Sequence, residues 1–134
     1  WILIIISITI IVSDQISSEL IKKSIGRVRP CNDNSLNNVR MLLEHCGGGF
    51  SFTSSHATNH FSFAMQLFLL LRYGWNNIYF ILLFLWASLI AYGQIYVGVH
   101  FPLDVIFGAV LGCFVAFVVN RFCSWLGLVR RIWT

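Results

Sequence analysis

Long apolar runs constrain the fold of this chain more than any other feature of its sequence. The segments 61–71, 77–97 and 102–120 contain almost no charged residues. Hydrophobic residues make up 57% of the chain and charged residues 10%, whereas an ordinary soluble domain is about 25% charged. Segments of this length and composition favour a lipid bilayer over water. The sequence therefore predicts an integral membrane protein.

The basic residues do not indicate a nucleic-acid partner. The formal net charge is +4, but the lysines and arginines lie between and beside the apolar segments and form no basic stripe. The first apolar run, 1–12, is shorter than the ~20 residues that cross a bilayer. It has no basic lead and no small-residue cleavage site, so we do not interpret it as a signal peptide. We expect instead that sequence upstream of Trp1 is missing.

Four helices and one substantial loop are expected, in a single all-α membrane domain that covers residues 1–134. The helices are predicted at 1–26, 54–72, 77–97 and 102–121, the last extending as far as 126. Gly26 is a natural helix stop and Pro102 suits a first helical turn. Asp14 and Glu19, in the first helix, must face protein or the interface. The polar loop 27–53 is expected in water or over the membrane face.

This topology places three polar clusters at the same end of the bundle. They are KKSIGRVRP (22–30), TSSH (53–56) and VGVHFPLD (97–104). Taken singly, each has a simple structural explanation. The lysines and arginines are interfacial cations, Ser54 is an N-cap, His100 is a hydrogen-bonded histidine and Asp104 is a first-turn carboxylate. These explanations do not account for why all three clusters share one side.

Together, the clusters contain the groups that phosphate chemistry needs. Cations, hydroxyls and helix N-terminal N–H groups can bind a tetrahedral dianion, and they are available at Lys22, Arg29, Ser54 and Ser55. Cleavage of a phosphoester also needs a nucleophile and a proton donor, and two imidazoles can divide these roles. Asp104 follows His100 by four residues, close enough to orient its ring and leave the other ring nitrogen free to attack.

The three motifs resemble the signatures of the type-2 phosphatidic acid phosphatase superfamily of membrane phosphatases. The first signature, Lys, six residues, Arg-Pro, matches 22–30. The second, Pro-Ser-Gly-His, appears as TSSH at 53–56. The third, Ser-Arg, five residues, His, three residues, Asp, matches at His100 and Asp104 but has Gly93 and Gln94 at its first two positions.

The resemblance implies a role for each matching residue. His100 would be the nucleophile that forms a phosphohistidine, Asp104 would orient it, and His56 would protonate the leaving group and later help to activate water. The phosphoryl oxygens would be bound by Lys22, Arg29, Ser54 and the backbone of Ser55. The family works without a metal or an organic cofactor. Its fold commonly has six membrane helices, of which this chain would cover the last four.

The chain departs from the family pattern at positions that affect phosphate binding. Thr53 and Ser55 replace Pro and Gly, which the site tolerates if the helix start keeps its shape. Gln94 replaces Arg and removes a cation; losing a charge-assisted contact of ~1.5–3 kcal/mol predicts a roughly ten- to hundredfold loss of affinity or rate unless another group compensates. Arg27 is a candidate substitute. Alternatively, Arg27 is an interfacial cation and Gln94 alone is adequate for a substrate of lower charge.

The remaining histidines allow an alternative interpretation. His60 follows His56 by four residues, so the two would share a helix face as a metal pair, but no third ligand has an obvious position and no metal is expected. We interpret His45 as a loop residue, and Asn59 and His60 as residues that line or support the pocket.

The cysteines and the charge distribution both bear on orientation. Cys31 and Cys46 bracket the loop, and a disulfide between them would contribute ~3 kcal/mol in the chain-entropy model and requires an oxidising compartment. Cys113 and Cys123 are interpreted as packing residues. The opposite end carries Arg72, Arg121, Arg130 and Arg131, which the positive-inside rule places in the cytoplasm. We therefore expect a bacterial inner-membrane protein whose active site faces the periplasm.

These observations predict a membrane lipid phosphatase that acts on a phosphate monoester or a diphosphate. Phosphatidate, phosphatidylglycerophosphate, polyprenyl diphosphate and lipid A phosphates all fit such a site, and the sequence does not choose between them. A lipid phosphotransferase that uses the same intermediate is one alternative. A catalytically inactive lipid-phosphate binder, in which Gln94 has abolished turnover, is another. The sequence gives no prediction of the oligomeric state.

Overall fold

The structure of the chain is a computed structural model that describes residues 1–36, 42 and 44–129. Within these residues the fold is all-helical, as predicted, and contains no strand. Two of the cations used to predict orientation, Arg130 and Arg131, lie outside the described residues, as do residues 37–41 and 43 of the predicted loop.

The helices begin and end close to the predicted positions. The long ones are α1 (Ile2–Gln15), α3 (Ser55–Leu71), α4 (Asn77–Tyr96) and α5 (Pro102–Trp125). Beyond α1, the predicted first helix continues through a π-helical segment (Ile16–Ile21) and the short α2 (Lys22–Ile25). It ends at Gly26, whose φ of 63° lies in the left-handed region that favours glycine. A 3₁₀ turn (Pro30–Asn32) follows in the loop.

Among the described residues, three helical stretches are long and apolar enough to cross a membrane, namely 2–32, α4 and α5. The exposed surface of α4 is strongly apolar and includes Leu82, Leu85 and Leu89, which suits contact with lipid. The chain is therefore an integral membrane protein, as its composition predicts.

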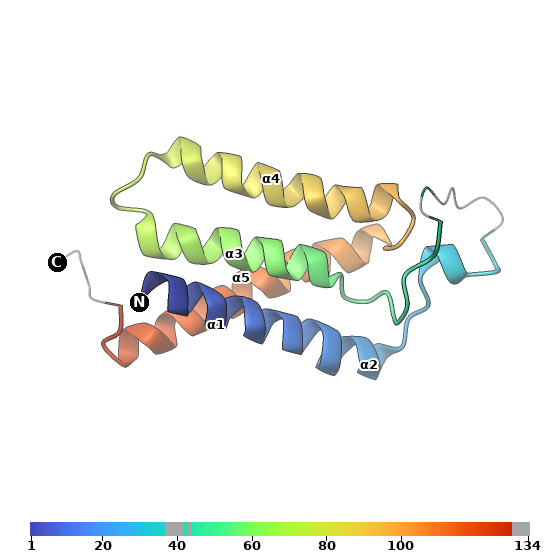
Figure 1. Cartoon of the computed structure of the whole chain (residues 1–134), viewed down its shortest axis with the longest axis horizontal. Coiled ribbons are helices and arrows are strands. Elements are labelled where there is room, and N and C mark those ends of the chain that lie inside the picture. The colour runs from blue at the N-terminus through green and yellow to red at the C-terminus, as the bar shows by residue number, and fades with distance from the viewer. Residues whose placement is uncertain (37–41, 43, 130–134) are drawn as a thin grey trace.

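The central helix of the bundle is α3, which contacts α1, α4 and α5 (Figure 1). Two glycines let α5 cross it closely. A Cβ at Gly108 would lie 2.7 Å from the carbonyl oxygen of Ser54, and a Cβ at Gly112 would collide with the carbonyl of Thr58. Small residues allow membrane helices to pack at short distance. This crossing fixes the start of α5 against the start of α3.

Polar side chains fill the contact between α1 and α3. Thr9, Ser13 and Ser17 recur every four residues along α1 and the π-helical segment, and all three are fully buried. The hydroxyl of Thr9 donates to the buried Gln66 of α3 over 3.3 Å. Hydrogen bonds of this kind between helices stabilise membrane bundles, and here they attach the first helix to the central one.

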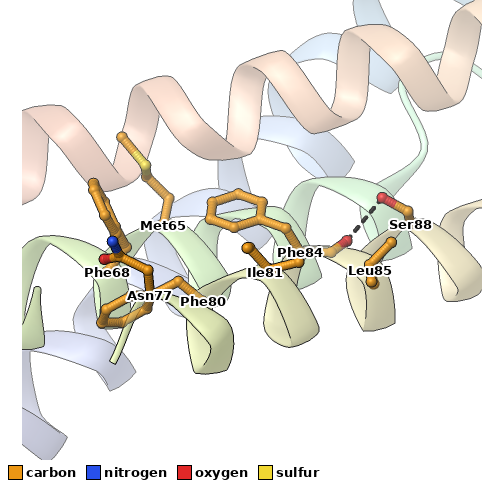
Figure 2. A pocket seen from close by; sticks show the side chains of 8 residues that line it. All are labelled: Met65, Phe68, Asn77, Phe80, Ile81, Phe84, Leu85 and Ser88. Carbon is orange, nitrogen blue, oxygen red and sulfur yellow. Dashed lines mark hydrogen bonds between the residues drawn. The ribbon is translucent and has the colours of Figure 1, made fainter. Parts of the chain in front are cut away.

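An apolar groove lies between α3 and α4 (Figure 2). Met65 and Phe68 of α3 and Phe80 and Phe84 of α4 line it. It extends to Asn77, at the end of α4 that lies away from the loop (Figure 1). The groove is therefore separate from the end of the bundle where the polar motifs meet.

Candidate active site

The three polar motifs meet at one end of the bundle, as the predicted topology requires. The end of α2, the start of α3 and the turn between α4 and α5 all lie on the side of the loop, opposite the start of α1 and the end of α5 (Figure 1). Two backbone contacts tie these segments together. The Ser54 N–H donates to the Asp104 carbonyl over 3.0 Å, and the Ser51 N–H donates to the Arg27 carbonyl over 2.7 Å.

The start of α3 is fixed by two serines. Ser54 is the N-cap, and its hydroxyl accepts a hydrogen bond from the Ala57 N–H. The hydroxyl of Ser55 lies 3.1 Å from that of Ser17 and 2.9 Å from that of Ser18, both in the π-helical segment. The capping role proposed for Ser54 on simple structural grounds is thus confirmed. The N-terminus of α3 therefore lies beside the first helix, and its backbone N–H groups favour the binding of an anion.

His100 lies in the turn between α4 and α5 and is almost fully buried. Its backbone N–H donates to the carbonyl of Gln94 over 3.2 Å, so the last turn of α4 sets its position. Asp104, in the first turn of α5, is fully buried and accepts a hydrogen bond from the Phe101 N–H over 3.0 Å. The Nδ1 atom of His100 lies 3.8 Å from Oδ2 of Asp104, which is longer than a hydrogen bond.

Ser51 occupies the space between these two side chains. Its hydroxyl oxygen lies 2.5 Å from Oδ2 of Asp104 and 3.4 Å from Nδ1 of His100, and it is fully buried. Ser51 was not among the predicted site residues, because only the folded loop brings it to the histidine. The one available signal was the row of hydroxyls that precedes His56.

Arg27 pairs with the carboxylate of Asp104. Its Nη1 atom donates to Oδ1 over 2.7 Å, and its guanidinium carbon lies 4.0 Å from the centroid of the Phe101 ring. In the structure, therefore, the guanidinium of this candidate phosphate ligand has a carboxylate as its partner.

Arg29 is held by the glycine-rich end of the loop. Its guanidinium donates to the carbonyl of Gly48 over 3.0 Å and to that of Gly49 over 3.4 Å. A Cβ at Gly47 would lie only 3.2 Å from Nη1 of Arg29, so glycine at this position lets the loop backbone approach the cation.

The predicted disulfide between Cys31 and Cys46 is present, with a Cα–Cα distance of 5.8 Å. It joins the start of the loop to the residue just before Gly47 and so helps to keep the glycines beside Arg29. Cys113 and Cys123 are free thiols in α5, the second of them buried.

Two cations act on the imidazole of His100. Burial lowers the pKa of His100 to about 4, and the positive charges of Arg29 and Lys22 act in the same direction, whereas Asp104 opposes them. The ring is therefore neutral near pH 7 and has a lone pair available for attack. Lys22 and Arg29 also interact electrostatically with His56. The structure thus brings two imidazoles and two cations to one place.

Beneath this cluster, a carboxylate of the first helix faces α3. The side-chain amide of Asn59 donates to Oδ1 of Asp14 over 2.9 Å, and the hydroxyl of Ser18 lies 3.5 Å from the same oxygen. Asp14 therefore faces protein, as expected for an acid within a membrane helix. Through this contact Asn59 joins α3 to the first helix.

Two histidines remain, of which His60 lies one helical turn after His56 and interacts with it electrostatically. The ring of His60 packs edge-on against Trp86, with centroids 4.7 Å apart, and His45 is an exposed loop residue. In the part of the chain that the structure describes, no group of three or more His, Cys, Asp or Glu side chains could hold a metal ion.

The chain matches the family model of the PAP2 superfamily over residues 2–127. It is 36% identical over 111 residues to a lipid A 4'-phosphatase of Bacteroides thetaiotaomicron, a match that covers 81% of this chain and 48% of the relative. It is 30% identical over 126 residues to a lipid A 4'-phosphatase of Porphyromonas gingivalis, covering 90% of this chain and 52% of the relative.

A third relative is named for a different activity. It is an undecaprenyl-diphosphatase of Sulfolobus acidocaldarius, 36% identical over 130 residues, with 95% of this chain and 59% of the relative covered. No solved structure matches the chain significantly.

These matches and the fold define the class of the protein: a helical integral membrane protein with a polar site at one end of its bundle. The chain belongs to the PAP2 superfamily. It spans about half the length of the two lipid A 4'-phosphatases that it matches.

Proposed function

We propose that the protein is a membrane lipid phosphatase that works through a phosphohistidine on His100. The observation that carries the proposal is the arrangement of two imidazoles, His56 and His100, beside the cations Lys22 and Arg29, with Asp104 behind the buried histidine. The names of the relatives, lipid A 4'-phosphatase and undecaprenyl-diphosphatase, support a phosphorylated lipid as the substrate.

In the first step, Nε2 of His100 attacks the phosphorus atom. A bond forms between Nε2 and phosphorus, and the bond between phosphorus and the leaving oxygen breaks. His56 gives its proton to that oxygen, which leaves as an alcohol or a phosphate. The negative charge of Asp104 offsets the positive charge that develops on the imidazole of His100.

In the second step, water attacks the phosphohistidine. His56, now neutral, takes a proton from the water as the oxygen–phosphorus bond forms and the bond between phosphorus and Nε2 breaks. Inorganic phosphate leaves, and His100 and His56 return to their starting states.

The phosphoryl oxygens are bound in this proposal by the cations and by the start of α3. Lys22 and Arg29 supply positive charge, the hydroxyl of Ser54 and the backbone N–H of Ser55 supply donors, and the amide of Gln94 adds one hydrogen bond. With these groups the chain itself supplies charge compensation, which is why the proposed reaction uses no metal.

The substrate class follows from where the site lies. The motifs are at the end of membrane-spanning helices (Figure 1), where a lipid headgroup would reach them while its acyl chains remain in the bilayer. Either a monoester or a diphosphate would present a terminal phosphoryl group there. Transfer of the phosphoryl group to a second lipid, or binding without turnover, are alternatives in which the same residues hold the phosphate.

The orientation is also part of the proposal. The Cys31–Cys46 disulfide suits an oxidising compartment, and Arg72 lies at the opposite end of the bundle, in the turn between α3 and α4. We therefore propose a bacterial inner-membrane protein with its site in the periplasm. An impermeant thiol reagent should label Ser35→Cys in intact spheroplasts and Gly74→Cys only after lysis; the reverse pattern contradicts this orientation.

Phosphate release from a panel of lipids tests the function. The full-length protein, purified in detergent, is incubated separately with phosphatidate, phosphatidylglycerophosphate, a polyprenyl diphosphate and lipid A. Release of phosphate from at least one lipid without a second lipid supports hydrolysis. Release that requires an acceptor lipid indicates transfer, and binding without release indicates an inactive binder. The matched control is His100→Asn, which should bind lipid but release no phosphate.

A further inference from the structure

A buried serine lies between the nucleophile and the acid behind it, where a direct hydrogen bond is absent. His100 Nδ1 and Asp104 Oδ2 are 3.8 Å apart, while the hydroxyl oxygen of Ser51 is 2.5 Å from the carboxylate and 3.4 Å from the ring nitrogen. Ser51 is thus close enough to both groups to connect them.

The direction of each hydrogen bond follows from the partners of Asp104. Arg27 donates to its Oδ1 over 2.7 Å, and the Phe101 N–H donates to its Oδ2 over 3.0 Å. A carboxylate paired with an arginine and with a backbone N–H is ionised, and an ionised carboxylate can only accept hydrogen bonds. Ser51 must therefore donate its single hydroxyl proton to Asp104.

Once that proton is committed, the oxygen of Ser51 can only accept from His100. The ring nitrogen that faces it, Nδ1, must then carry the proton of the neutral imidazole, and Nε2 must carry the lone pair.

The loop fixes Ser51 in this position. Its N–H donates to the carbonyl of Arg27, the residue whose guanidinium pairs with Asp104, and its side chain is fully buried. Arg27, Ser51 and Asp104 therefore form one connected unit that joins the loop to the first turn of α5.

We infer that Ser51 is a positioning residue: it connects Asp104 to Nδ1 of His100, selects the tautomer with the proton on Nδ1, and so leaves Nε2 free to attack phosphorus. The inference deepens the proposed function and rests on it. In the phosphohistidine intermediate the Nδ1 proton remains on the ring and is donated to Ser51, whose own proton is donated to Asp104, so the carboxylate stabilises the charged ring through the serine.

The tautomer can be measured without turnover. The chain has four histidines, so nitrogen NMR of histidine-labelled, full-length protein in detergent resolves few signals, and His100→Asn identifies those of His100. At pH 7 we expect a protonated Nδ1 and an unprotonated Nε2 at His100. A protonated Nε2 with an unprotonated Nδ1 would overturn the inference.

Kinetics of two matched serine variants give the second readout. In Ser51→Ala we expect kcat to fall about 10- to 100-fold while KM stays within about threefold, as for other residues that orient a reacting group. Ser51→Thr, which keeps the hydroxyl, should recover most of kcat. The control is Ser62→Ala, which removes an equally buried hydroxyl that donates to the Asn59 carbonyl within α3, and it should stay within about twofold of the wild type.

The outcomes separate the inference from the function on which it rests. If the wild type turns over and Ser51→Ala matches Ser62→Ala, the positioning role is wrong and the phosphatase remains. If the wild type releases no phosphate from any lipid, the proposed function fails, and the NMR measurement still decides the tautomer. If Ser51→Ala does not fold, the tautomer of the wild type and the rate of Ser51→Thr decide between the two outcomes.

Discussion

The surroundings of His100 favour its neutral form, which is the form that the proposed nucleophilic attack requires. Burial and two nearby cations lower its pKa to about 4. A histidine in the unfolded chain titrates near 6.5, so the folded protein binds this proton more weakly than the unfolded chain does. The neutral ring is therefore favoured across the physiological range, and folding is favoured above pH 6.5 and progressively less as the pH falls toward 4.

A pH titration followed by NMR tests this account of His100. In the phosphate-free protein, we expect its ring signals to stay those of a neutral imidazole from pH 8 to about 5.5 and to change only near the value of about 4. A midpoint of His100 at or above about 6.5, the ordinary value for a histidine, contradicts the effect of burial on the ring.

His56 is proposed as the acid that protonates the leaving group. The loss of activity in His56→Ala should therefore depend on the substrate. A leaving group with a low pKa needs little protonation. In His56→Ala, kcat/KM should therefore fall roughly 100-fold or more with a lipid alkyl phosphate but much less with an aryl phosphate analogue. The measurement is kcat/KM for both substrates in both proteins. Equal losses for good and poor leaving groups would show that His56 is not the acid.

Arg27 and Gln94 can be tested together, because the structure pairs Arg27 with Asp104. If Arg27 replaced the missing cation at position 94, Gln94→Arg would rescue Arg27→Ala. We expect no rescue: Arg27→Ala should lower kcat about tenfold or more by leaving a buried carboxylate unpaired, and the two changes should combine additively in kcat/KM. A double variant that regains wild-type kcat/KM would restore the phosphate-binding role of Arg27.

At the level of residues, the motif spacing was sufficient to predict part of the site. Lys22 and His56 lie in the last and first turns of their helices, and Arg29 and His100 lie in the segments that follow a helix end, so all four come together where helix ends could be placed from the sequence. Ser51 could not be predicted, since its contacts depend on how a long loop closes. The partner of Arg27 was missed for the same reason: a loop cation next to a phosphate motif gives no indication that it pairs with an acid 77 residues away.

At the level of elements, the loop and its disulfide position Arg29. The bond between Cys31 and Cys46 anchors the segment that leads directly into Gly48 and Gly49, whose carbonyls accept from the guanidinium. Removing the bond frees that segment in the unfolded and the folded protein alike, so both stability and phosphate binding should suffer.

The double variant Cys31→Ser, Cys46→Ser tests this role. We expect a loss of ~3 kcal/mol in the free energy of unfolding, measured in detergent, and a KM raised several-fold as Arg29 loses its fixed position. Cys113→Ala, which removes a free thiol of α5, is the control and should leave KM unchanged. Unchanged stability and KM in the double variant, or free thiols at both positions in the native protein, would contradict this account.

Some features of the helices could be predicted from the sequence and others could not. Ser54 as N-cap and Gly26 as C-terminal stop could be identified from local signals, and the structure confirms both. The π-helical segment Ile16–Ile21 could not, because apolar spacing does not specify the hydrogen-bond register of a helix. Its position has a consequence for the site, since Ser17 and Ser18 both reach Ser55 at the start of α3 from this segment, and such segments recur at functional sites.

At the level of the whole molecule, the bundle brings distant parts of the sequence to one end. The central α3 contacts α1, α4 and α5 (Figure 1), and the glycines of α5 set its start against the start of α3. The apolar side chains exposed along α4 and α5 keep these helices in the membrane. The proposed reaction therefore takes place at the membrane surface, on a headgroup whose acyl chains remain in lipid.

The most direct measurement of the central proposal is to trap the phosphoenzyme. The full-length protein is mixed with a lipid substrate labelled with radioactive phosphorus in the phosphoryl group and is denatured in alkali within milliseconds. We expect label on the wild-type chain that is stable in base and released by acid, as for a phosphoramidate. We expect no label on a His100→Asn variant that is as stably folded as the wild type. Label that persists in His100→Asn, or turnover by the wild type without any labelled chain, would contradict a phosphohistidine on His100.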